Sequence, residues 1–554
     1  MGKSEKMTAA LLWRWYTRGD EHHRMTDLYE KTKKAHRFFR GEQWYGVESG
    51  GEELPFYNFI QPVVEHKVAS VCMNTMSIQY APMEHAGALG PGAAQICQKL
   101  TAYAARQWER LKMDKLCWEV VKNACIAGDS YLYFHDGDCQ AQVVDTCDLF
   151  LGDETCPDVQ KQPYLLIARR QTVGEVRKAA RRYGLGEAEV QSIVPDDGPL
   201  DRQEREEEWE HSDTREEEQL CTTLLAFWRD EDGVVCCTRG TRDVLYQKPV
   251  RLYGGGRGLS LYPIAAFRWM GRRGSSRGDG EVTPLIPNQI ETNKMLARRL
   301  MNAKMTAFSR LVYNADKVLN KEALEEVGAA IRVRDMQANA VTDIVSYLGA
   351  APMSPDAQAL AQELVQQTRD LAGAGDAALG QVNPEKASGA AIIAVRDQAA
   401  LPLNEQIADF RQFVEDVASI WFELWAAYYP MELSRGIYAL SGEELRRLRV
   451  EIRIDVSPNS PYSRYAQEQA LENLFQKGVI TFEEYVAALD ENAAAPKQKL
   501  EDIIQARKSQ GQRQRESRVG TAILGSRAGE SNQAGWVEHG KERNGSGATP
   551  PLPH

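Results

Sequence analysis

The residues of this sequence that could do chemistry are, first, its cysteines. All ten lie between Cys72 and Cys237, and none forms the C-x-x-C pair that is typical of zinc sites. Cys147 and Cys156 together with His135 are the best candidates for metal ligands. Scattered reduced thiols in an intracellular protein explain them better. We therefore expect no metal site.

Short motifs offer little more. The chain has no GxxxxGK[ST] phosphate loop, no HExxH and no GxSxG. GAGDAA at 373–378 lacks the preceding strand and final glycine of a dinucleotide loop. GGGRG at 254–258 and the segment around RGD at 277–279 are interpreted as glycine-rich turns. The adjacent His22 and His23 are expected on a helix surface. The sequence thus predicts no catalytic residue and no cofactor.

Composition bounds the class of protein. The 554 residues are 43% hydrophobic and 26% charged, which is globular, and their number implies more than one domain. No apolar run is long enough to cross a bilayer, so we expect a soluble protein with no membrane partner. The net charge of −11 argues against tight, sequence-independent binding of nucleic acid. An acidic run at 201–218 is interpreted as a solvated face.

The elements that position these residues change in type along the chain. Up to residue 283, helical stripes alternate with strands such as YLLIARR at 164–170, so we predict an α+β fold. A long helix follows. A small α/β insertion separates it from a second long helix, which begins at Ser354 and Pro355. A later helical pattern, the longest of all, contains Pro402, which predicts a kink.

Between the second long helix and the longest one lies a loop, 373–389, of small residues with no large hydrophobic anchor. Loops of this length inside a compact domain are uncommon and usually functional. Its glycines permit unusual backbone angles, so we expect it to move. The side chains in it that could contact a ligand are polar: Asp376, Gln381, Asn383, Glu385 and Lys386.

The order of these elements resembles that of tailed-bacteriophage portal proteins, in particular those of long-tailed phages and prophages. Several segments are similar to that family: YNFIQPVVEHKVASVC at 57–72, NACIAGDSYLYF at 123–134, VGEVRKAARRYG at 173–184, DGEVTPLIPNQIETNKMLARRL at 279–300 and SGAAI at 388–392. The resemblance covers residues from about 50 to 510 and rests on the order of the segments rather than on one diagnostic motif.

The resemblance implies a division of the chain into the parts of a portal subunit. These parts are a wing at 1–283 with a returning strand at 448–456, stem helices at 284–309 and 354–372, a clip at 310–350, a tunnel loop at 373–389, a long kinked helix at 390–430, a helical crown at 463–510 and a disordered tail at 511–554.

The resemblance also implies a function. Such a chain forms a homo-oligomeric ring, expected to be a dodecamer, at one capsid vertex of the virion, after assembly in the host cytoplasm. Double-stranded DNA passes through the ring during packaging and ejection. The implied partners are the terminase large subunit, the major capsid and scaffolding proteins and a head–tail adaptor. The residues implied at the channel are the five polar loop residues and four basic residues of the first stem helix: Lys294, Arg298, Arg299 and Lys304.

Two other classes of function remain open at this point. One is a metal-dependent nucleic-acid hydrolase whose acidic residues meet only in the fold. The other is a non-viral ring-forming scaffold. The mass of the 62.1 kDa chain in solution separates a portal ring from a stable monomer, which would favour the hydrolase, because the two differ about twelvefold.

Overall fold

The computed structural model describes residues 7–47, 54–73, 75–83, 92–135, 138–196, 216–252, 258–307, 310–324, 326, 328–334, 340–348, 355–373, 375, 401–430, 433, 438, 440, 442, 445, 448–457, 471–489, 500, 503 and 504. The chain divides into two compact units, Met1–Asn459 and Ser460–His554. Helices and antiparallel strands interleave in the first unit, which confirms the predicted α+β class.

The first unit begins with two helices, α1 (Ala9–Met25) and α2 (Leu28–Arg40). The Thr8 side chain caps α1 by accepting a hydrogen bond from the Leu11 amide. Asp27 separates the helices with a left-handed φ of 54°. Gly41, with φ of 93°, ends α2. The apolar stripe across this region does not reveal the break.

A helical layer packs against a small sheet in the main core. Its helices are α3 (Ile60–Cys72), α4 (Ala93–Arg110) and α5 (Met113–Ala127). The sheet runs in the order β3-β2-β9, with β2 (Asp129–His135) between β3 (Gln140–Val144) and β9 (Ile264–Arg268). Trp269, Phe267 and Tyr131 are among the largest side chains buried there.

A second, five-stranded antiparallel sheet holds the strands in chain order: β4 (Leu149–Leu151), β5 (Tyr164–Thr172), β6 (Leu220–Arg229), β7 (Val235–Gly240) and β8 (Gln247–Arg251). Leu12 and Tyr16 of α1 pack against Phe150 and Leu224 of this sheet. A separate apolar cluster joins α6 (Val173–Arg182) and α7 (Glu187–Gln191) to Cys221 and Tyr246. Short 3-10 turns lie at Val159–Lys161 and Glu216–Glu218.

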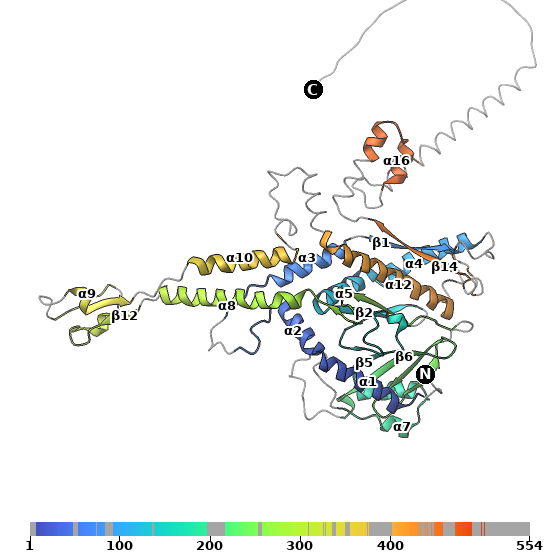
Figure 1. Cartoon of the computed structure of the whole chain (residues 1–554), viewed down its shortest axis with the longest axis horizontal. Coiled ribbons are helices and arrows are strands. Elements are labelled where there is room, and N and C mark those ends of the chain that lie inside the picture. Colours follow the sequence, from blue (N-terminus) through green and yellow to red (C-terminus); the bar gives the residue numbers. More distant parts are fainter. Residues whose placement is uncertain are drawn as a thin grey trace, which may run out of the picture. The chain divides into compact units, whose positions relative to one another are not determined.

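Two helices that lie side by side, α8 (Val282–Ala307) and α10 (Pro355–Leu371), extend from the rest of the first unit; we call them the arm (Figure 1). It begins after the short hairpin β10 (Met270–Gly271) and β11 (Gly278–Asp279). Helix α8 (Val282–Ala307) then runs outward, and α10 (Pro355–Leu371) returns beside it. The far end carries an antiparallel hairpin of β12 (Arg310–Tyr313) and β13 (Val345–Leu348), the short helix α9 (Val341–Ile344), a 3-10 turn at Lys321–Leu324 and a bridge between Val318 and Val333.

The chain returns to the core through α12 (Asn404–Tyr428), whose apolar face packs against β9. Pro402 lies in a 3-10 turn, Leu401–Leu403, directly before α12 and not inside this helix. The kink predicted at Pro402 depends on residues 390–400, which lie outside the described residues. Strand β14 (Val450–Ser457) then pairs antiparallel with β1 (Thr75–Pro82), so a late strand completes an early part of the fold.

In the second unit the structure describes α16 (Phe482–Ala488). Thr481 and Glu484 form a reciprocal capping box at its start. Phe475, Phe482 and Tyr485 pack ring to ring beside it. Most of the predicted crown and the whole predicted tail, 511–554, lie outside the described residues.

Candidate functional site: the two-helix arm and its root

The root of the arm is fixed to the core by Glu281, the residue directly before α8. Its carboxylate pairs with Lys67 Nζ at 2.6 Å and accepts a hydrogen bond from Trp269 Nε1 at 3.2 Å. Its backbone amide donates to the Cys125 carbonyl at 2.8 Å. Glu281 and Lys67 are both buried, so the attraction between their charges is needed to offset the free-energy cost of removing each from water.

Two glycines bring the root into backbone contact with the end of α5. A Cβ added to Gly280 would lie 2.4 Å from the Ile126 carbonyl oxygen, and one added to Gly278 would lie 2.4 Å from that of Gly128. No residue with a Cβ atom fits at these two positions without moving the backbone. The first turn of α8 therefore starts from a fixed place on the core.

A short segment between α2 and α3, residues 55–59, crosses α8; we call it the strap. Asn293 Oδ1 accepts a hydrogen bond from the Tyr57 amide at 3.0 Å. Gln289 Oε1 accepts one from the Phe59 amide at 3.1 Å, and Gln289 Nε2 donates to the Tyr57 carbonyl. Both amide side chains are fully buried. They satisfy backbone groups of the strap that no helix or sheet satisfies.

A buried ionic cluster lies around Arg277, directly upstream of the root. Arg277 is 7% exposed and its guanidinium contacts Asp129 Oδ2 at 3.2 Å and Glu154 Oε2 at 3.2 Å. It also donates to the Leu149 carbonyl at 2.7 Å. Its Nη2 lies 2.9 Å from His23 Nε2, which must accept here because a guanidinium can only donate.

The cluster sets the ionisation of Glu154. Burial alone raises the pKa of this carboxyl group. The charge of Arg277 and hydrogen bonds from Ser276 and Arg277 outweigh the burial, so the pKa is lowered well below its ordinary value. Glu154 is therefore a buried carboxylate at neutral pH, held by the cation beside it.

One expectation about these residues is wrong. His23 was expected on a helix surface, but it is fully buried and stacks on Phe150 with ring centroids 4.5 Å apart. Its neighbour His22 is about 42% exposed, with Nδ1 3.7 Å from Glu154 Oε1. The segment around Arg277 is a turn, as expected, but its arginine is the centre of a buried network. Neither residue carries a local signal of burial, because their partners lie far away in the sequence.

The four predicted basic residues of α8 do not share one face. Lys294 and Arg298 are one helical turn apart and both are exposed; Lys294 Nζ pairs with Glu291 at 2.8 Å. Arg299 is half-buried and lies ~100° around the helix from Arg298. Lys304 is exposed, about a third of a turn from Arg298 in the other direction.

Lys294 and Arg298 belong to a longer row with Met301 and Met305, at spacings of four, three and four residues; we call this row the 294–305 stripe. All four side chains are exposed, the two methionines by 57% and 53%. Arg298 follows Gln289 by nine residues, which is two and a half helical turns. By the same geometry the centre of the stripe lies about 130° around α8 from the midpoint of Gln289 and Asn293, on the side away from the strap.

Further large apolar side chains of the arm are exposed off this stripe. Leu300 is 42% exposed on α8, and Leu360 is 52% exposed on α10. At the end of the arm, Val312 and Tyr347 of the β12–β13 hairpin are 53% and 70% exposed. Large apolar side chains are thus exposed both along the arm and at its end.

The five loop residues predicted at the channel lie outside the described residues: Asp376, Gln381, Asn383, Glu385 and Lys386. The structure describes Gly373, which follows α10 with φ of 68°, a backbone angle that favours glycine. The positions of the loop side chains stay predictions.

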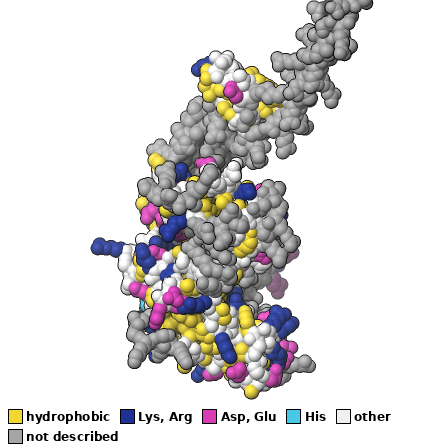
Figure 2. Space-filling view, turned by 90° about the vertical axis from the view of Figure 1, so that its right-hand side faces the viewer, with side chains coloured by type: hydrophobic (Ala, Val, Ile, Leu, Met, Phe, Trp, Pro, Cys, Tyr) yellow, Lys and Arg dark blue, Asp and Glu magenta, His cyan; other side chains and the backbone are white. Residues whose placement is uncertain are grey.

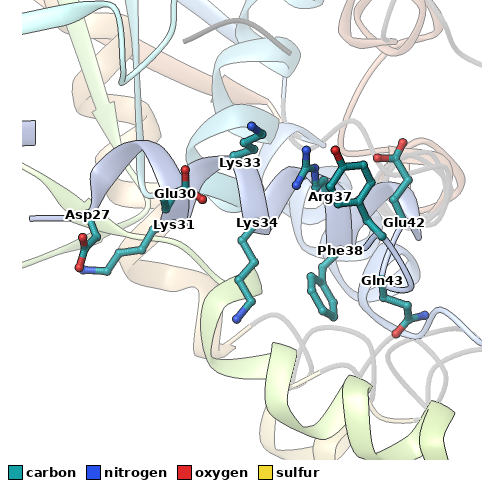
Figure 3. A pocket seen from close by; sticks show the side chains of 10 residues that line it. Asp27, Glu30, Lys31, Lys33, Lys34, Arg37, Phe38, Glu42 and Gln43 are labelled. Atoms are coloured by element: carbon teal, nitrogen blue, oxygen red, sulfur yellow. The ribbon is translucent and has the colours of Figure 1, made fainter. Parts of the chain in front are cut away.

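One hollow of about 450 Å³ lies along α2 and the residues that follow it, up to Tyr45 (Figure 3). Its lining mixes four cations with three carboxylates: Lys31, Lys33, Lys34, Arg37, Asp27, Glu30 and Glu42. Arg37 stacks 3.8 Å above the Tyr45 ring. Charges of both signs are also interspersed with apolar side chains on the face of the molecule shown in Figure 2. Neither view presents a uniformly basic field of the kind that grips a phosphate backbone.

The ten cysteines are free thiols. Burial raises the pKa of Cys72 to about 12 and also raises that of Cys147, which keeps both thiols neutral. Among the residues that the structure describes, no three His, Cys, Asp or Glu side chains are placed to hold a metal ion. None of the described helices has both the length and the apolar character needed to span a membrane.

The first unit is thus an α+β body from which a two-helix arm with exposed apolar side chains extends. The sequence profile of the phage P22-like portal proteins matches residues 183–522, and the chain belongs to this family. It is thus a tailed-phage portal protein, and such proteins are structural components of the virion capsid. A comparison with curated proteins gave no match.

Proposed function

We propose that this chain forms a closed ring, expected to be a dodecamer, at one capsid vertex, and that DNA enters and leaves the capsid through the ring. The observation that carries the proposal is the arm: a 26-residue helix with a 17-residue partner and large exposed apolar groups on both. In a ring, each subunit has neighbours on two sides, which can cover such groups. Family membership favours this proposal over a hydrolase or a non-viral scaffold.

The parts of the chain are assigned roles on this basis. Helices α8 and α10 form the stem, 310–350 the clip, the α+β body before α8 the wing, and 463–510 the crown. Leu300 and Leu360 contact the neighbouring copy, since they are exposed and lie off the 294–305 stripe. The loop at 373–389 lies at the narrowest part of the channel and moves as DNA passes.

The 294–305 stripe faces the channel in this proposal. Lys294 and Arg298 give few contacts to phosphate, and Lys294 already shares its charge with Glu291. Methionines continue the same face, with flexible, uncharged side chains. A net charge of −11 and a channel wall with few cations let DNA slide, because each firm phosphate contact would add affinity that slows movement.

The partners follow from the same roles. The packaging motor, which is the terminase large subunit, and later a head–tail adaptor dock on the ring, and the major capsid and scaffolding proteins surround it. The chain itself has no catalytic role in this proposal; assembly takes place in the host cytoplasm.

Two variants test the proposal. Deleting 374–384 is expected to leave ring assembly intact and to impair packaging or retention of DNA in a packaging assay. Leu360→Asp is expected to prevent ring assembly, because it places a charge in an apolar contact between copies. The matched control Gln367→Asp adds a charge at an exposed position of the same helix and should assemble. Rings from Leu360→Asp, or normal packaging by the deletion variant, would contradict the assigned roles.

A further inference from the structure

Helix α8 is held in two different ways along its length. Its first turn is fixed by buried apolar side chains, Val282, Leu285 and Ile286. The next two turns have no fully buried apolar side chain among the described residues; their buried positions are Gln289, Thr292 and Asn293. Apolar packing resists separation, but it is not directional, whereas hydrogen bonds fix both distance and orientation.

The strap is itself fixed on the core, so it can act as a reference. Trp44 Nε1 donates to the Pro55 carbonyl at 3.0 Å, and Asn58 Nδ2 donates to the Phe39 carbonyl at 2.9 Å. Asn58 Oδ1 also accepts from the Ile60 amide at 3.1 Å, which ties the strap to the start of α3. The strap is thus held near both of its ends, independently of α8.

We propose that Gln289 and Asn293 are positioning residues that lock the rotation of α8 about its axis and thereby aim the 294–305 stripe. Gln289 and Asn293 are four residues apart and lie on one face, so their hydrogen bonds to Tyr57 and Phe59 fix that face against the strap. Turning the helix by one residue, about 100°, would break these bonds and leave the amide of the buried Phe59 unpaired. The stripe on the side away from the strap would turn with it.

The inference rests on the proposed function for its meaning, because the stripe matters only if it faces a channel. It assigns a cause to the rotation of α8 about its axis, and family membership does not supply that cause. The residues that decide which side chains face the DNA are then buried amides on the far side of the helix.

The test uses full-length rings free of DNA, with hydroxyl-radical oxidation of methionines read by mass spectrometry. Met301 is 57% exposed on the stripe, while Met295 is half-buried and lies about 100° around the helix from Lys294. In the double variant Gln289→Met with Asn293→Leu, the ratio of Met301 to Met295 oxidation is expected to fall at least twofold. The control Gln367→Met removes an exposed amide of α10 that binds Glu363 within its own helix, and its ratio should not change.

An unchanged ratio in the double variant would overturn the inference. If the double variant does not fold, the unmodified chain still decides: amide hydrogen exchange at Tyr57 and Phe59 is expected to be at least a hundredfold slower than in an unstructured peptide. Exchange at the unstructured rate would show that the strap is not held and would refute the lock.

A separate measurement distinguishes failure of the α8 lock from failure of the proposed function. In DNA-filled heads, Lys294 is expected to be acetylated at least threefold more slowly than in empty rings. If DNA gives no protection while the methionine ratio still changes in the double variant, the lock stands and the channel-facing role of the stripe fails.

Discussion

Replacing Arg277 by methionine is expected to destabilise the first unit by about 3–5 kcal/mol, the usual cost of removing one partner from a buried ion pair. Methionine keeps much of the side-chain volume, so the loss comes from charge and hydrogen bonding. Asp129, 1% exposed, and Glu154, whose side chain is 15% exposed, would lose the cation that now contacts both. The Leu149 carbonyl would also lose its donor.

The matched control is Arg272→Met. Arg272 lies in the same hairpin and pairs with Asp279, but both side chains are more than half exposed. Exposed pairs contribute roughly 0–1 kcal/mol, because water screens them. The two arginine variants therefore differ in burial and not in chemistry, and the expected difference in unfolding free energy between them is about 2–5 kcal/mol.

The stability deficit of Arg277→Met is expected to change with pH in one direction. The folded pKa of Glu154 is lowered, so its contribution to stability is present above the unfolded value of about 4.3 and is lost as the pH falls toward the folded pKa. Without Arg277, burial raises that pKa instead. The deficit of Arg277→Met relative to the unmodified chain should therefore be largest near neutral pH and shrink below about pH 5.

Urea unfolding followed by tryptophan fluorescence measures this, with Trp269 as a buried reporter close to the cluster. Midpoints at pH 7 and pH 4.5 are compared for the unmodified chain and both variants. A deficit below about 1 kcal/mol at pH 7 would refute the reasoning, as would a deficit that is the same at both pH values.

Three further predictions concern single positions. Burial, helped by the charges of Glu415 and Asp158, raises the pKa of Asp416 to about 6, so the stability of the first unit falls as the pH rises from about 4 to 6. In urea unfolding, Asp416→Asn should flatten this pH dependence and stabilise the unit at pH 7.5 by about 1–3 kcal/mol. Gly280→Ala should lower the unfolding midpoint by an amount equal to at least about 2 kcal/mol, because the new Cβ meets a backbone oxygen; an unchanged midpoint would mean that the root is not tightly packed. Trp269→Phe should cost about 1–3 kcal/mol through the lost donor to Glu281, and a loss no larger than that of an exposed Trp118→Phe control would contradict it.

Local periodicity in the sequence predicted many of the helices. It predicted little of the pairing between residues that are far apart in the chain. The stripes that run through α8, α10 and α12 are visible in the sequence because helical spacing repeats within a few residues. The break between α1 and α2 is not, since it depends on one residue, Asp27, in a left-handed conformation that the apolar pattern does not record.

The polar contacts that fix the arm had no sequence signal. Gln289 meets Tyr57 across 232 residues, and His23 meets Arg277 across 254. A glutamine or a histidine in a helix is most often exposed, and only the tertiary fold brings it a partner. Lys294, Arg298, Arg299 and Lys304 were grouped by their shared charge and their place on one helix, although helical spacing separates them onto different faces.

The most direct test of the central claim is electron microscopy of the purified full-length chain, with native mass spectrometry of the same sample. The account predicts closed rings with a central channel, an assembled mass that is about twelve times 62.1 kDa, and α8 and α10 along the channel wall. A stable 62.1 kDa monomer at micromolar concentration, or rings whose channel is lined by the wing sheets instead of the arm, would contradict it.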